Sequence, residues 1–317
     1  MSGDHPNQPD STLPVHGSAA GVPYVALPPT AVDAVAAGPT RLILAWPGFE
    51  PPRTASALAA AIPMTGVPAW RVYLDLPGRL PGGLGSGAIL ETEAIEAYGE
   101  AVERAVERLP EAVAEIRRAL ALPDGPVGLA GFSVGAAAAL LAVARGTVPV
   151  STAALVAPVI APSRAALAVE KRAGRERTWT DRAHALADRL DLGSLAGEIA
   201  GRDVALLLIA GAKDRVVPPN EIAALVDLLR RRATTPTDGC AVESVTFRMG
   251  HALAAEPGTE ARPPITDAVR VDGALTDWFR ERLAEARPRQ AAETPPVTLQ
   301  VPGSPPPRAA SSAAPTR

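Results

Sequence analysis

The stretch GPVGLAGFSVGAAAALLAV, residues 125–143, places one serine between two glycines where an apolar run gives way to an alanine-rich run. The apolar residues 125–132 are typical of a strand buried on both faces, and residues 134–145 are typical of a helix. Residues 131–135 therefore fit G-x-S-x-G between a strand and a helix, the context of a nucleophile elbow. Such a turn exposes the hydroxyl of Ser133 at the end of the strand. The alternative is a small residue that packs a tight strand-to-helix turn.

The two glycines of this motif allow the helix and the strand to approach each other closely. The amide of Val134 then lies at the N-terminus of the helix, where unpaired N–H groups and the helix dipole favour negative charge. If Ser133 attacks a carbonyl group, we expect the Val134 N–H to stabilise the resulting oxyanion.

Strands and helices alternate on both sides of the motif. Short apolar runs predict further strands at 41–46, 70–76, 152–158, 203–211 and 242–249, and an edge strand at 22–27. Helical patterns cover 54–62, 91–122, 220–232 and 265–286, and the second of these is expected to break or kink near Pro110. This alternation predicts the α/β class, with a doubly wound, mostly parallel sheet.

The 317 residues suffice for one large α/β domain, which we place at residues 21–286. Charged, mainly helical residues 162–200 interrupt the alternation and predict a small helical cap. Residues 1–20 and the Pro- and Ala-rich residues 287–317 contain few large apolar side chains. We expect both ends to be disordered because they bury too little surface to offset their ordering entropy.

Composition excludes several classes of function. A net charge of −3 argues against a general nucleic-acid-binding protein. The single cysteine, Cys240, permits no intrachain disulfide, and no stretch is long and apolar enough to predict a membrane span. Because the first residues lack the pattern of a secretory signal, we expect a cytoplasmic location with no membrane partner. The oligomeric state is left open.

A serine nucleophile needs a base at neutral pH, and the sequence has four histidines. His5 and His16 lie in the N-terminal segment, and His184 lies on a charged face of the predicted cap. His251 follows the last predicted strand, where a loop side chain can reach a nucleophile on a neighbouring strand. We therefore expect His251 to be the base.

The base needs an acid to fix its tautomer and to stabilise its charged form. Asp214 follows the predicted strand 203–211 in a short loop, so it is the preferred acid. Asp75 and Asp238 are competitors in less suitable places. The chain order Ser133, Asp214, His251 matches the order of the α/β-hydrolase template.

With these residues in place, the chain resembles the α/β-hydrolase superfamily over about residues 22–286. The resemblance rests on Pro-Gly-Phe at 47–49, the motif at 131–135, GAKDRVVPP at 211–219 and GHAL at 250–253. It is similar to the dienelactone-hydrolase and prolyl-oligopeptidase-like branch. The dienelactone hydrolases use a cysteine nucleophile, so their substrate does not carry over to a chain with serine.

The resemblance implies an eight-stranded sheet and Ser-His-Asp acyl chemistry without a metal ion or organic cofactor. It also implies that the amide of Phe49 is the second oxyanion donor, although Pro47 stands where the family usually has histidine. The expected function is a serine hydrolase that cleaves a carboxylic ester or related acyl bond of a small-molecule substrate. Alternatives are an acyltransferase, thioesterase or peptidase with the same triad, and a non-catalytic binding protein.

Two further side chains are candidates for contact with the substrate. Arg53 follows the loop that contains Phe49 and could meet a substrate carboxylate, although a surface ion pair is the simpler reading. Trp179, in the predicted cap, could line the substrate pocket or pack the cap onto the sheet.

Overall fold

The computed structural model describes residues 13–77, 87–232 and 241–286. Their centre is an eight-stranded sheet in the order β1-β2-β5-β4-β6-β7-β8-β9. The strands are β1 (Val15–Ala19), β2 (Val22–Leu27), β4 (Leu42–Trp46), β5 (Trp70–Leu74), β6 (Val127–Phe132), β7 (Val150–Val156), β8 (Ala205–Gly211) and β9 (Val242–Phe247). Only the pairs β1–β2 and β2–β5 are antiparallel, so the predicted doubly wound, mostly parallel sheet is confirmed.

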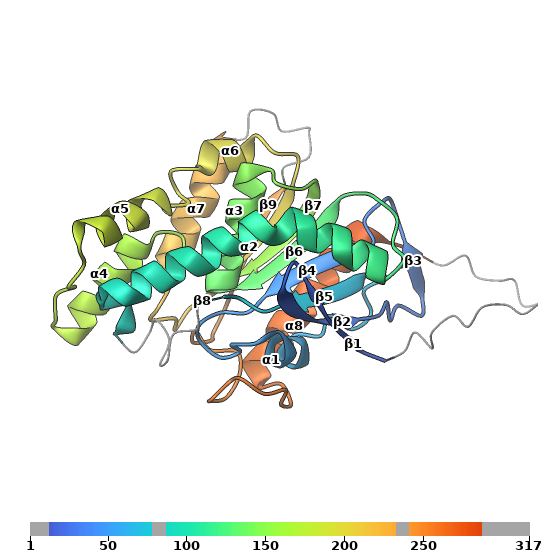
Figure 1. Ribbon diagram of the computed structural model, residues 1–317, viewed down its shortest axis with the longest axis horizontal. Coiled ribbons are helices and arrows are strands. Elements are labelled where there is room, and N and C mark those ends of the chain that lie inside the picture. The colour runs from blue at the N-terminus through green and yellow to red at the C-terminus, as the bar shows by residue number, and fades with distance from the viewer. Residues whose placement is uncertain (1–12, 78–86, 233–240, 287–317) are drawn as a thin grey trace, which may run out of the picture. The chain divides into compact units, whose positions relative to one another are not determined.

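Helices cover both faces of the sheet (Figure 1). One face packs against α2 (Thr92–Ala119), α3 (Val134–Arg145), α6 (Ala196–Ala200) and α7 (Pro219–Arg232). The other face packs against α1 (Ala55–Ala61) and α8 (Thr266–Leu283). Because each central strand contacts helices on both sides, its residues are apolar almost without interruption, as the sequence predicted.

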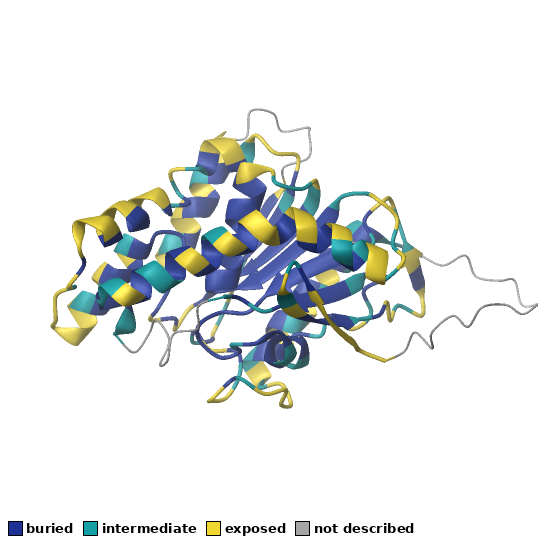
Figure 2. Cartoon of the chain, viewed as in Figure 1, coloured by how far each residue is buried: buried dark blue, intermediate teal, exposed yellow. Residues whose placement is uncertain are grey.

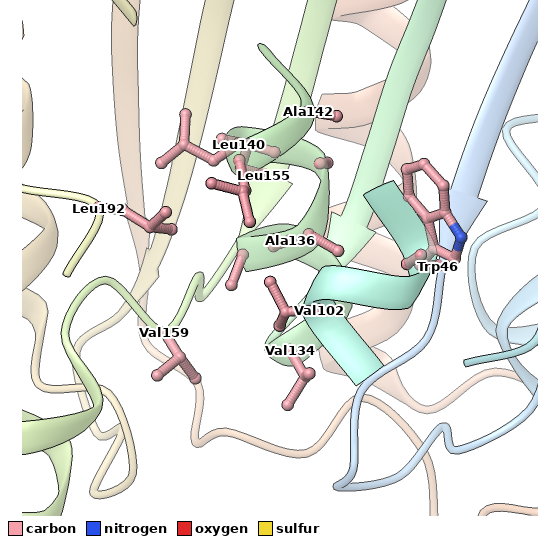
Figure 3. Close-up of a cluster of buried hydrophobic side chains, with 14 of the residues drawn as sticks. Trp46, Val102, Val134, Ala136, Leu140, Ala142, Leu155, Val159 and Leu192 are labelled. Atoms are coloured by element: carbon pink, nitrogen blue, oxygen red, sulfur yellow. The ribbon is translucent and has the colours of Figure 1, made fainter. Parts of the chain in front are cut away.

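The side chains of a strand divide between these two faces. In β4, Leu42, Leu44 and Trp46 join the core under α2 and α3, whereas Ile43 and Ala45 join the core under α1 and α8. Strands β4 and β6, at the centre of the sheet, are buried throughout (Figure 2). Alanines of α3, such as Ala136 and Ala142, lie in the first of these cores beside the larger Leu140 (Figure 3). Small side chains let α2 and α3 approach closely, which suits a sequence with only 3% aromatic residues.

Three short strands depart from the prediction. β1 shows that residues 15–19 belong to the sheet, so the boundary predicted at residue 20 is wrong there. Its first four residues are exposed, so it lacks an apolar pattern and is held by main-chain hydrogen bonds to β2. β3 (Ala34–Ala36) pairs with β10 (Ala284–Ala286), and α8 therefore ends at Leu283 rather than at residue 286. Residues 1–12 and 287–317, also predicted to be disordered, lie outside the described residues.

Helix α2 continues through Pro110, so the break predicted there is absent. Pro110 lies on the exposed side of the helix. Buried side chains continue on both sides of it, with Leu109 before it and Val113 after it. Packing of this apolar face keeps the helix together despite the loss of one backbone hydrogen bond.

The predicted cap segment, residues 162–200, contains α4 (Pro162–Ala173), α5 (Asp181–Arg189) and α6. The amide of Thr178 donates to the Leu90 carbonyl at 2.8 Å, which ties this segment to the 3-10 turn Ala88–Leu90 before α2. Within it, side-chain hydrogen bonds from Arg177 hold the pKa of Glu170 at about 2. No helix in the described part of the chain is long and apolar enough to cross a membrane.

Candidate active site

Ser133 lies in the sharp turn between β6 and α3, with φ of 55° and ψ of −114°. This positive φ is unfavourable for a residue with a side chain. The flanking glycines make the turn possible. A Cβ on Gly131 would lie 2.4 Å from the Gly135 carbonyl oxygen, and a Cβ on Gly135 would lie 2.3 Å from the Trp46 carbonyl oxygen. Neither position can therefore hold a larger residue without a shift of the backbone.

The structure brings together three side chains that the sequence singled out. His251 Nε2 lies 2.8 Å from Ser133 Oγ, and His251 Nδ1 lies 2.7 Å from Asp214 Oδ2. Ser133 follows β6, Asp214 follows β8, and His251 lies in the loop after β9. All three strands run parallel, so their carboxyl ends meet at one edge of the sheet. This edge is where ligands bind in open α/β sheets.

The Asp214 carboxylate is fixed by groups other than His251. Its Oδ1 accepts hydrogen bonds from the amides of Val216 and Val217 at 2.8 and 2.9 Å. A carboxylate held in this way accepts a hydrogen bond from a protonated His251 Nδ1, which leaves Nε2 as the acceptor for the Ser133 hydroxyl. The arrangement thus selects the tautomer in which the histidine can remove a proton from serine.

The surroundings of these side chains exclude most water. Ser133 is fully buried, and Asp214 and His251 expose 6% and 8% of their surface. The ring of Phe132 lies 5.2 Å from the imidazole of His251, between centroids. In such an environment hydrogen bonds and charges interact more strongly than in water.

Two backbone amides lie beside Ser133. A Cβ on Gly48 would come within 2.9 Å of the Ser133 Cβ, so the loop between β4 and α1 passes directly over the serine. Phe49 follows Gly48 in this loop, and Val134 begins α3. Within the described residues, the N–H groups of Phe49 and Val134 donate to no protein acceptor. Unpaired buried amides are rare, and these two can donate to an oxygen at the serine.

The competing acid and histidines that lie in the described part of the chain do not join this cluster. Asp75 accepts a hydrogen bond from the Ala55 amide at 2.6 Å and thereby caps the N-terminus of α1. Asp238 lies outside the described residues. His16 is exposed on β1, and His184 is exposed on α5, where its ring contacts Trp179.

The two predicted substrate contacts have other partners in this structure. The Arg53 guanidinium donates to the Phe49 carbonyl at 2.8 Å, to the Glu256 carboxylate at 2.6 and 3.1 Å and to the Pro257 carbonyl, so most of its N–H donors are occupied. The ion pair is therefore the better reading. The Trp179 indole is buried and donates to the Ile89 carbonyl at 2.9 Å, so it packs the cap segment against the turn before α2.

The sequence did not single out some residues that shape this cluster. The Phe132 ring beside His251 and the Val216 and Val217 amides on Asp214 had no signal in the sequence. The glycine at position 48 was a signal, since it marks a close backbone approach. In the described residues, no group of three or more His, Cys, Asp or Glu side chains could hold a metal ion.

Comparison with known proteins gives structural matches only. No protein-family model matches the sequence, and no curated protein matches it. TT1662 from Thermus thermophilus is similar with a TM-score of 0.53 and 20% identity, over 87% of this chain and 99% of that chain. Acylaminoacyl peptidase from Pyrococcus horikoshii has a TM-score of 0.58 and 13% identity, over 88% of this chain and 43% of its own.

A puromycin-hydrolyzing peptidase from Mycobacterium tuberculosis is also similar, with a TM-score of 0.56 and 17% identity over 88% of this chain and 41% of its own. This chain thus spans less than half the length of either peptidase. At these identities the matches establish architecture and not activity. Together with the strand order, they show that the chain has the α/β-hydrolase fold.

Proposed function

We propose that the protein is a serine hydrolase that cleaves a carboxylic ester or related acyl bond through Ser133, His251 and Asp214. The observation that carries this proposal is the continuous chain of two hydrogen bonds, 2.8 and 2.7 Å long, from serine through histidine to aspartate. A non-catalytic binding protein has no need of a serine with a positive φ whose hydroxyl is bonded to a tautomer-fixed histidine.

In the first step, Ser133 Oγ attacks the carbonyl carbon of the substrate while its proton passes to His251 Nε2. Asp214 stabilises the imidazolium that forms, without taking its proton. The negative charge on the substrate oxygen is held by the N–H groups of Val134 and Phe49. Removal of one such donor typically lowers the rate by about 10²–10³.

The intermediate then collapses. His251 gives its proton to the leaving group, and an ester bond between the acyl group and Ser133 remains. In the second half-reaction a water molecule loses a proton to His251 and attacks this ester. The carboxylic acid leaves, and the proton returns to Ser133 Oγ. No metal ion or organic cofactor enters this sequence of steps.

A peptidase is the second candidate. It is supported by the peptidase names of two structures that are similar to this chain. Both reactions use the same acyl-enzyme intermediate and differ in the leaving group. Comparison of a 4-nitrophenyl ester with an aminoacyl 4-nitroanilide distinguishes them, because only a peptidase turns over the anilide at a rate approaching that of the ester. A thioester substrate and a competing alcohol acceptor test the thioesterase and acyltransferase alternatives.

The first experiment measures hydrolysis of 4-nitrophenyl acetate by the wild type and by Ser133→Ala. Loss of the nucleophile is expected to lower turnover by about 10⁴–10⁶. Ser194→Ala is the matched control, because the Ser194 hydroxyl donates to the Asp191 carbonyl in the cap segment. Turnover by Ser133→Ala at the wild-type rate would remove Ser133 from the mechanism.

A further inference from the structure

The loop between β4 and α1, residues 47–54, is joined to the loop between β9 and α8, residues 248–265, through contacts of residues 51–54 with residues 253–259. The Leu253 amide donates to the Pro51 carbonyl at 2.9 Å, and the Arg53 amide donates to the Gly258 carbonyl at 2.7 Å. A Cβ on Gly258 would lie 2.5 Å from the Pro51 Cβ, so the two loops are in close contact. One loop carries the proposed oxyanion donor and the other carries the proposed base.

The side chain of Arg53 spans this junction. Its Nε donates to the Phe49 carbonyl at 2.8 Å within its own loop. Its two terminal nitrogens donate to the Glu256 carboxylate at 2.6 and 3.1 Å, and one of them also donates to the Pro257 carbonyl. The Arg53 side chain is only 13% exposed, so water competes little for its part-buried bond to the Phe49 carbonyl, whereas its partner Glu256 is 71% exposed.

The bond to the Phe49 carbonyl affects the orientation of the Phe49 N–H. The Phe49 N–H belongs to the peptide unit that links Gly48 to Phe49. In the preceding peptide unit, the Gly48 amide donates to the Pro52 carbonyl at 3.3 Å. In the following peptide unit, the Phe49 carbonyl accepts a hydrogen bond from Arg53. Hydrogen bonds thus fix the peptide units on both sides of the one that carries the proposed Phe49 donor. A donor that is fixed before the reaction stabilises an oxyanion without a cost of reorganisation.

From this geometry we infer that Arg53 is a positioning residue for the oxyanion site, and that it couples the Phe49 amide to the loop of His251. This inference rests on the proposed function. The guanidinium does not bind a substrate carboxylate, because the Phe49 and Pro257 carbonyls and the Glu256 carboxylate already accept from it. It acts on the reaction through Phe49.

The experiment compares Arg53→Met with Arg280→Met. Arg280 is a matched control, because it also donates to a backbone carbonyl, that of Gly66 at 2.6 Å, and to a carboxylate, that of Asp33 at 2.8 Å. Gly66 precedes β5, so this contact is at the amino ends of the parallel strands, away from Ser133. Active-site titration with a fluorophosphonate gives the fraction of competent enzyme for each variant.

For Arg53→Met we expect kcat per titrated site to fall by about 10- to 100-fold, a part of the loss typical for a whole oxyanion donor. KM should change by less than about threefold, because the oxyanion forms only after substrate binding. The inhibition constant of a boronic acid that forms a tetrahedral adduct on the serine should rise in proportion to the fall in kcat/KM. Arg53→Lys should recover part of the loss, and Arg280→Met should keep wild-type kinetics per site.

A merely structural role lowers the titrated fraction and leaves kcat per site and the boronic acid constant unchanged, which would overturn the inference. If Arg53→Met fails to fold, Arg53→Gln is measured in the same way, and wild-type kcat per titrated site with a wild-type boronic acid constant in that variant would also overturn the inference. A raised KM with unchanged kcat would instead mean that Arg53 binds substrate. Failure of the wild type to react with the fluorophosphonate would refute the proposed function itself, which is a distinct result.

Discussion

Two polar clusters, each with buried side chains, lie at opposite ends of the parallel strands, and they are built differently. At the carboxyl ends, Ser133, His251 and Asp214 bond to one another in a line. At the amino end of β5, Arg71 donates to the carbonyls of Pro28 and Val67 and to the Thr30 hydroxyl. The first cluster joins ionisable and nucleophilic side chains, and the second joins a side chain mainly to backbone.

The second cluster has the properties of a structural element. Tyr73 donates to the Ile62 carbonyl at 2.7 Å, and Asp272 accepts from the Met64 amide at 2.7 Å. Burial lowers the pKa of Arg71 and raises the pKa values of Tyr73 and Asp272. These groups fasten loops to the sheet. Burial of polar groups therefore does not by itself mark a reactive site. The carboxyl-end cluster differs from the amino-end cluster in its line of side-chain bonds, its serine with a positive φ and two neighbouring amides that have no protein acceptor among the described residues.

The largest effect should come from Asp214→Asn at the carboxyl-end cluster. Asparagine can donate a proton where only an acceptor suits His251 Nδ1, so the wrong tautomer becomes favoured. In a serine protease with the same triad this change costs about 10⁴ in turnover, and we expect a large loss of ester hydrolysis here. Steady-state kinetics and a thermal melt measure it. A loss of less than about threefold would contradict the assignment of Asp214.

Arg71→Met at the amino-end cluster should lower stability without lowering turnover. Removal of the buried guanidinium takes the Arg71 donor away from the Pro28 carbonyl and is expected to cost about 3 kcal/mol of unfolding free energy. For a domain of this size that corresponds to a fall in melting temperature of about 6 °C. Turnover per titrated active site should stay at the wild-type value. A specific loss of kcat without loss of stability would erase the distinction between the two clusters.

The smallest effect should come from Asp75→Asn, which makes the same chemical change as Asp214→Asn at a helix cap. The asparagine oxygen can still accept from the Ala55 amide, but the negative charge at the N-terminus of α1 is lost. We expect a cost of about 0.5–1 kcal/mol in chemical denaturation. Hydrolysis should remain within about twofold of the wild type. A kinetic loss as large as that of Asp214→Asn would make Asp75 the acid instead.

Much of the fold follows from local patterns. The limits of α3, Val134–Arg145, follow from the residues after the serine motif, and β8 follows from an unbroken apolar run. β1 was missed because exposed residues on an edge strand leave no apolar pattern. The continuity of α2 through Pro110 depends on packing along the whole helix, which a local proline signal cannot reveal.

The candidate site also has a part that the sequence predicts and a part that it does not. Ser133, Asp214 and His251 each follow a strand, so topology alone brings them to one edge of the sheet. The contact between Arg53 and Glu256 joins residues that are 203 positions apart, and both lie in loops without regular structure. The sequence could suggest that Arg53 forms an ion pair. It could not identify the partner, nor the bond to the Phe49 carbonyl that gives this side chain its proposed role.

The central claim is that His251 activates Ser133 as a nucleophile, and covalent labelling tests it most directly. The wild type is treated with a fluorophosphonate, and the adduct is located by intact mass and peptide mapping. We expect one adduct per chain, on Ser133. The adduct should be absent from Ser133→Ala and should form far more slowly in His251→Ala, while Arg71→Met reacts at the wild-type rate per folded chain. A folded wild type that remains unlabelled, or an adduct on another residue, would contradict the account.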